Sequence, residues 1–180
     1  MKKIFKYLLI VIGAVVLIVG SVAIYINSSG LPTYDTPKID LKVEVTPQRI
    51  ERGRKIANML CRNCHQNPVT KQLTGNLMKD LPKEFGEIHS RNITQHPTKG
   101  IGSWTDGEIA YLLRTGIRRN GTYSPPYMIK LPHVPDEDIY SIIAYLRSDD
   151  PTVKAADVDN IEPKETFLTK VLCRVAFKPF

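Results

Sequence analysis

Several residue patterns that mark common classes of protein are absent from this sequence or scarce in it. No basic stripe interleaved with aromatic residues is present, and the net charge of +7 is mild and mixed with acidic residues, so we do not expect nucleic-acid binding. No segment between Thr46 and Arg147 carries a strong strand pattern, so we expect the folded region to be all-α. With 42% apolar residues, the chain has the composition of a folded domain with attachments.

Cysteine is also rare, with 3 in the chain, yet two of them lie in one short stretch, Cys61-Arg62-Asn63-Cys64-His65. The C-x-x-C-H pattern is the attachment site of a c-type haem, in which both thiols bond to the porphyrin and the histidine binds the iron. On a helical turn, residues at i, i+3 and i+4 lie on one side. One turn can therefore hold the edge of the ring and ligate its iron.

Two other kinds of site use paired cysteines. A structural zinc site needs about four nitrogen or sulfur ligands, but the remaining cysteine, Cys173, is distant and has no C-x-x-C partner. A thioredoxin-like redox pair follows a strand in a βαβ unit, whereas the residues before Cys61 have a helical pattern. We therefore predict one haem c, bound covalently through Cys61 and Cys64, with His65 as an iron ligand.

The first 30 residues are predicted to form a membrane anchor. Lysines at the start precede an uncharged, largely apolar run over residues 7–26, which as a helix would cover about 30 Å, the thickness of the hydrocarbon core. The alternative is a cleaved signal peptide with Ser21 and Ala23 at its cleavage site, but the run is longer than such peptides usually have. The basic end predicts that the rest of the chain lies outside the cytoplasmic membrane of a bacterium.

The segment from residue 31 to residue 45 contains prolines and no periodicity, so we interpret it as an extended tether, or as a loop packed on the domain. A helix is expected next, because the Thr46 hydroxyl can cap it and Pro47 suits its first position. Its apolar face includes Gly53, which predicts that another helix crosses closely there. This helix ends at the haem motif.

Two more helices are expected after a long irregular segment. Residues 66–102 are interrupted too often by glycine and proline for regular structure, so we expect them to wrap the haem. Thr105 and Glu108 have the spacing of a capping box. The last helix should begin near Pro135 and run to about Arg147, with acidic residues in its first turn.

The order of these segments resembles that of a class I cytochrome c domain, and more narrowly the cytochrome c domains of membrane-bound dehydrogenase cytochrome subunits. The segments that carry the resemblance are C-R-N-C-H, F-G-E-I-H-S-R-N-I-T (85–94), G-I-G-S-W-T-D (100–106) and D-E-D-I-Y-S-I-I-A-Y-L-R-S (136–148). The resemblance implies an all-α fold around one haem over residues 46–150, with the first and last helices crossing where Gly53 meets the region of Tyr145. It also implies that Trp104 and Asn92 lie near the haem propionates.

The second axial ligand of the iron determines what the site can do. Methionine sulfur raises the reduction potential and closes the site to other ligands. Met128, after a proline pair and before the last helix, occupies the position where the family has this ligand. Met78 is a weaker candidate, and His133 would give a bis-histidine iron of lower potential.

Residues 151–180 form an extension with a polar linker and an amphipathic segment. Its apolar stripe at helical spacing consists of Phe167, Leu168, Val171, Leu172 and Val175. We expect this segment to dock on its own domain, with the bilayer surface and a partner protein as alternatives. Cys173 is expected to be a buried free thiol, because haem uses the other two.

The function expected from these features is the transport of single electrons between respiratory or dehydrogenase partners at the outer side of the membrane. Neither enzymatic activity nor a small-molecule substrate is expected. The alternative is a ligand-binding, sensor or peroxidase-like haem protein, which needs an open or labile sixth position on the iron.

Overall fold

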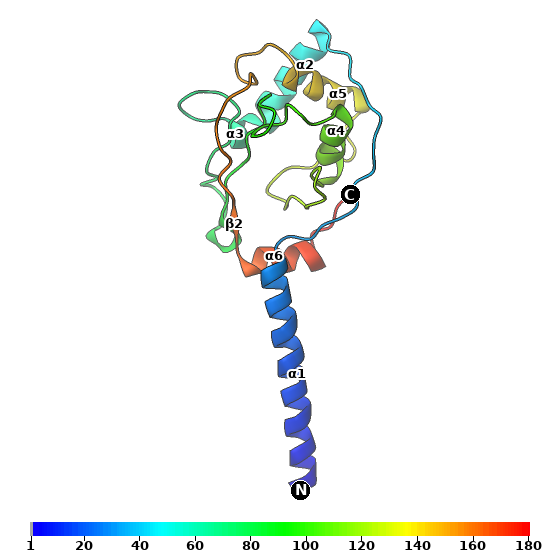
Figure 1. The fold of residues 1–180 in the computed structure, drawn as a ribbon, viewed down its shortest axis with the longest axis vertical. Coiled ribbons are helices and arrows are strands. Elements are labelled where there is room, and N and C mark those ends of the chain that lie inside the picture. Colours follow the sequence, from blue (N-terminus) through cyan, green and yellow to red (C-terminus); the bar gives the residue numbers. More distant parts are fainter. Residues whose placement is uncertain (1) are drawn as a thin grey trace.

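A computed structural model describes residues 2–180. Its elements, in chain order, are α1 (Lys2–Ser29), α2 (Pro47–Leu60), α3 (Arg62–His65), the 3-10 helix η1 (Lys83–Phe85), β1 (Gly86–Glu87), α4 (Asp106–Thr115), α5 (Asp136–Leu146), β2 (Lys164–Glu165) and α6 (Phe167–Val175). Figure 1 shows α1 projecting from a domain in which α2, α4 and α5 are joined by long irregular segments. The prediction of a mostly helical fold is confirmed.

Helix α2 begins and ends where the sequence predicts. The Thr46 hydroxyl accepts a hydrogen bond from the Arg49 N–H at 3.3 Å, and Pro47 occupies the first turn. Gly53 and Ala57 are its buried residues. Cys61 ends the helix, and α3 follows at once. The haem motif is therefore held at the junction of two helices.

The packing of α2 against α5 depends on Gly53. A methyl group on this residue would overlap the carbonyl of Ser141 and would come within 2.9 Å of the Tyr145 Cβ. Because the helices are in backbone contact at this point, only glycine fits. The close crossing of the first and last domain helices at Gly53 and Tyr145 is confirmed.

The core lies between α2, α4 and α5. Helix α4 has the predicted capping box between Thr105 and Glu108, and Gly116 ends it with a left-handed φ of 79°. Helix α5 is buried from Ile139 to Leu146, and its acidic first turn forms ion pairs with neighbouring segments, such as Glu137 with Arg49 at 2.8 Å. Both helices therefore match their sequence signals.

One strand pair was not predicted. β1 pairs with β2 in antiparallel register, Gly86 opposite Glu165 and Glu87 opposite Lys164, which corrects the expectation of no strand between Thr46 and Arg147. Each strand has two residues, too few to show alternation, and the partner lies far away in the sequence. Gly86 has a φ of 107°, and a side chain there would overlap the Lys164 carbonyl. The pair attaches the C-terminal extension to the domain.

Residues 31–45 follow the surface of the domain, the second of the two arrangements considered for them. The Tyr34 N–H donates to the Gly121 carbonyl at 2.9 Å, and the Val43 N–H donates to the Asp106 carboxylate at 2.9 Å. Val43 is buried in the core. The segment therefore binds the domain at both of its ends.

Helix α1 has large apolar side chains that face outward along most of its length. Those from Ile4 to Tyr25 are mostly exposed. Within the described residues it is the one helix long and apolar enough to cross a membrane. This finding fits the predicted anchor, although a signal sequence has the same properties.

Candidate haem site

The two cysteines and the histidine of the motif lie within five residues, at the junction of α2 and α3. The Cys61 N–H donates to the Ala57 carbonyl at 2.8 Å, and the His65 N–H donates to the Cys61 carbonyl at 2.9 Å. Burial raises the pKa of the Cys61 thiol to about 11. The pKa of the Cys64 thiol is also raised, mainly by burial and to a smaller extent by the negative charge of Asp80. Neither cysteine forms a disulfide within the described residues, so both thiols are available to bond to a haem.

The imidazole of His65 is oriented by a backbone carbonyl. Its Nδ1 lies 2.7 Å from the Arg91 carbonyl oxygen, so the assigned tautomer has Nδ1 protonated and donating. Burial lowers the pKa of His65, which keeps the ring neutral. The lone pair on Nε2 is then free to bind a metal ion, as in other sites where the second ring nitrogen is fixed by a hydrogen bond.

The irregular segment after the motif holds this junction in place. The Gly75 N–H donates to the His65 carbonyl at 2.8 Å, and the Ser90 hydroxyl donates to the Cys64 carbonyl at 2.6 Å. Two buried polar atoms in this region, Thr74 Oγ1 and Arg91 Nε, have no hydrogen-bond partner in the part of the chain described. Such donors suit a cofactor that carries carboxylate groups.

The zinc alternative lacks ligands. Across residues 2–180 no three histidine, cysteine, aspartate or glutamate side chains lie together in a way that could hold a metal ion. A site with two thiols and one fixed imidazole instead fits a haem, which brings its own four nitrogen ligands and needs only axial ligands from the protein.

Comparison with known proteins agrees with this geometry. The family model described as Cytochrome c matches residues 50–150, more than half of the chain. The chain belongs to the cytochrome c family. Since covalent haem c is the cofactor of this family, the prediction of haem c at Cys61 and Cys64 is confirmed.

Several curated proteins resemble the chain over half of its length or more. A nicotinate dehydrogenase subunit of Pseudomonas putida is 33% identical over 115 residues, which are 62% of this chain and 10% of that protein. The fructose dehydrogenase cytochrome subunit of Gluconobacter japonicus is 36% identical over 54% of this chain and 21% of its own length. The gluconate 2-dehydrogenase cytochrome c subunit of Pantoea cypripedii is 30% identical over 63% and 26%. The chain thus spans about a quarter or less of these relatives.

The proposed second ligand, Met128, lies on the segment that joins α4 to α5. Its side chain is half-buried, and its N–H donates to the Pro125 carbonyl at 3.1 Å. The same carbonyl accepts from Lys130 Nζ at 2.6 Å, so the turn is fixed on both sides of the methionine. His133, the alternative, is exposed to solvent, and an exposed imidazole is poorly placed to ligate a buried iron. Met128 remains our proposed ligand.

Trp104 and Asn92 have different environments. Trp104 is half-buried against the core, its ring lies 5.7 Å from the Arg119 guanidinium carbon, and its indole N–H has no hydrogen bond within the described residues. Asn92 is buried, and its amide nitrogen donates to the carbonyls of Ala156 and Val158, both at 3.1 Å. No amide hydrogen of Asn92 is left for a propionate, so among these two only Trp104 remains a proposed donor.

Asn92 instead fastens the extension to the loop that carries Arg91. We expect Asn92→Ala to lower the free energy of unfolding by about 2 kcal/mol, because it leaves buried carbonyls without donors. Residues 151–163 should then be cleaved faster by a protease. Thermal unfolding and timed proteolysis of the holoprotein measure both effects. Asn58→Ala, an exposed asparagine on α2, is the control, and equal cleavage of the two variants would refute this role.

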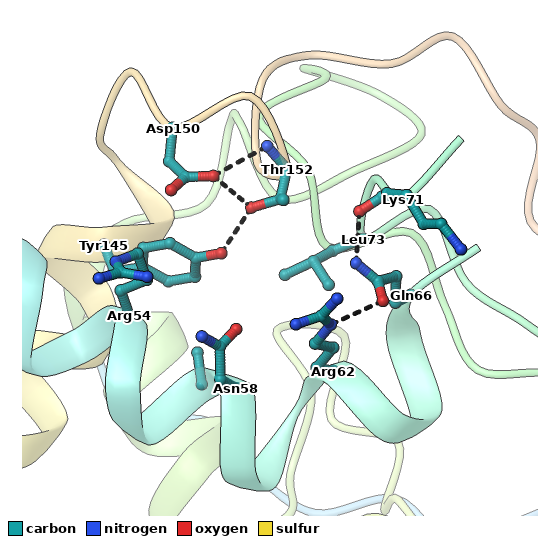
Figure 2. A pocket seen from close by; sticks show the side chains of 10 residues that line it. Arg54, Asn58, Arg62, Gln66, Lys71, Leu73, Tyr145, Asp150 and Thr152 are labelled. Atoms are coloured by element: carbon teal, nitrogen blue, oxygen red, sulfur yellow. Dashed lines mark hydrogen bonds between the residues drawn. The ribbon is translucent and has the colours of Figure 1, made fainter. Parts of the chain in front are cut away.

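A hollow of about 190 Å³ lies between α2 and the start of the extension (Figure 2). Its polar groups bind one another: Arg62 donates to Gln66 at 2.7 Å, and the hydroxyls of Tyr145 and Thr152 lie 2.5 Å apart. Neither the two motif cysteines nor His65 lines it. We therefore regard the hydrogen-bonded side chains around this hollow as a support for α2 and α3, and not as part of the haem site.

Sequence reasoning missed the acceptor of the His65 hydrogen bond. The Arg91 carbonyl is a backbone atom, and any residue type at that position supplies one. Only the path of residues 66–102 decides which carbonyl reaches the imidazole. The family segment that contains Arg91, residues 85–94, was the one available signal.

Proposed function

We propose that the chain is a membrane-anchored monohaem cytochrome that carries single electrons between redox proteins outside the cytoplasmic membrane. The observation that carries this proposal is His65, oriented by the Arg91 carbonyl beside Cys61 and Cys64, in a domain of the cytochrome c family that is joined to the apolar helix α1. The haem supplies the one-electron change between ferrous and ferric iron.

The side chains of the domain would hold the iron in one coordination state. His65 would bind it through Nε2, kept in position by the Arg91 carbonyl. Met128 would bind it from a turn fixed by the Pro125 carbonyl. With both ligands supplied by the protein, an exogenous ligand would have to displace one of them, and little reorganisation would accompany a change of one charge. An electron carrier requires this, whereas a sensor or peroxidase requires an open position.

The bilayer contact is assigned to α1. Its uncharged run matches the thickness of the hydrocarbon core, and the lysines at its start favour the cytoplasmic side. The domain would then lie on the outer side. Because relatives are named as subunits of nicotinate, fructose and gluconate dehydrogenases, we propose a dehydrogenase as the electron donor.

Carbon monoxide tests the electron-transfer assignment. We expect the reduced full-length protein, purified from membranes in detergent, to leave its absorption spectrum unchanged when carbon monoxide is added at neutral pH. Rapid formation of a carbonyl complex would instead establish the open site of a sensor or peroxidase. Proteins that co-purify with the chain, identified by mass spectrometry, should include a dehydrogenase subunit.

A further inference from the structure

Helix α6 lies across the end of α1 in Figure 1, on the side of the domain from which α1 projects. Lys170 Nζ donates to the Asn27 carbonyl at 2.9 Å, and Arg174 Nη2 donates to the Ser29 hydroxyl at 2.7 Å. Both acceptors belong to the last turn of α1, directly after its apolar run ends at residue 26. Helix α6 is thus fixed at the level where the membrane surface falls if α1 spans the bilayer.

The face of α6 that contacts the domain is small and partly polar. Thr169 and Cys173 are both 0% exposed, and the Thr169 hydroxyl donates to the Phe85 carbonyl at 2.9 Å. Cys173 packs with Ile117 and Tyr123. The helix therefore docks on its own domain, as expected, but not through its apolar stripe.

Three residues of the apolar stripe face outward. Phe167 is 44% exposed, Leu168 46% and Val175 69%, while Val171 and Leu172 are half-buried. Phe180, beyond the helix, is 71% exposed. An apolar helix face left in water is costly. Cationic side chains border it, as is usual for helices that lie in the headgroup region.

We infer that α6 is an interfacial helix, whose outward face of Phe167, Leu168 and Val175 enters the headgroup and upper acyl region of the bilayer beside α1. This inference rests on the membrane anchoring proposed above. It assigns the bilayer as the occupant because the helix is hydrogen-bonded to the last turn of the anchor, directly after the apolar run, and has exposed apolar side chains at that level. The domain is then bound to the membrane at two places and has a fixed orientation.

Spin labels on the full-length holoprotein test this arrangement. Leu168→Cys and Val175→Cys are labelled with a nitroxide and reconstituted in phosphatidylcholine vesicles that contain phosphatidylglycerol. The control Val69→Cys is 84% exposed on the loop after the haem motif, and Val16→Cys reports α1. Unsubstituted protein should stay unlabelled, because burial shields Cys173 and raises its pKa to about 11. The absorption spectrum checks that each variant folds.

We expect the labels at 168 and 175 to be several-fold less accessible than the label at 69 to a water-soluble nickel chelate, and more accessible to oxygen, which partitions into lipid. Nickel accessibility equal to that at 69, with the label at 16 deep in the bilayer, would overturn the interfacial role of α6 and leave the anchor intact. Shielding from both reagents would mean a protein contact and would also overturn it. An aqueous label at 16 would refute the anchor itself.

Discussion

Alanine at position 128 is expected to remove the absorption band of methionine-ligated ferric iron and to let the reduced protein bind carbon monoxide. The substitution replaces the thioether side chain of Met128 with a methyl group. The iron would then have no sulfur ligand opposite His65. Since methionine ligation raises the potential relative to water or nitrogen ligands, the reduction potential should fall on the order of 0.1 V or more. Absorption spectroscopy, carbon monoxide titration and redox titration measure the three effects.

Met78→Ala is the matched control for this experiment. Met78 is also half-buried, and its N–H donates to the Ile88 carbonyl at 2.9 Å. The substitution therefore removes the same side chain from a different part of the domain. It should keep the band, and the variant should not bind carbon monoxide. If the band survives in Met128→Ala and disappears in Met78→Ala, the ligand assignment is wrong. If the unsubstituted protein already lacks the band, a bis-histidine iron is indicated and His133→Ala becomes the next variant to examine.

Gly53→Ala should strongly destabilise the domain. The new Cβ would overlap the Ser141 carbonyl, which is backbone and cannot rotate away, so α2 and α5 must separate. We expect a cost of about 3 kcal/mol, the upper end of the usual range for overpacking, equivalent to a fall in Tm of roughly 10 °C or more. Thermal unfolding followed by haem absorbance, together with the yield of holoprotein, measures the loss.

Gly20→Ala is the control for this prediction, because it adds the same methyl group at a glycine of another helix. No atom lies within 4 Å of the position that its Cβ would occupy, and it lies in α1, outside the haem domain. Its effect on the unfolding of the domain should be within about 0.5 kcal/mol. A Gly53→Ala protein as stable as Gly20→Ala would show that the two helices do not pack as described.

Local chemistry made the helices predictable. Thr46 and the pair of Thr105 and Glu108 cap helices through contacts between residues three apart, so their signals are complete within a few positions. Gly53 indicated a close crossing, because a glycine on the apolar face of a helix lets a second backbone approach. The haem motif was equally local, since all of its chemistry lies within one helical turn.

Long-range contacts were beyond the same reasoning. The role of Asn92 depends on carbonyls more than sixty residues away, and its residue type fits either a turn or a haem contact. The outward orientation of the apolar stripe of α6 was also not predictable. Periodicity shows that a helix has an apolar face, but it does not show whether that face contacts the domain or the surroundings. Only the narrow contact at Thr169 and Cys173 reveals the direction.

The route of residues 31–45 along the domain limits how this protein can meet a partner. Because that segment is hydrogen-bonded to the domain and α6 is bound to the last turn of α1, little free chain remains for the domain to swing toward a distant protein. Figure 1 places α2 and α3 on the side of the domain away from α1. If α1 is the anchor and the domain the electron carrier proposed above, electron exchange would occur at a set height above the bilayer. Lateral diffusion in the membrane, and not movement of the domain on a tether, would then bring donor and acceptor together.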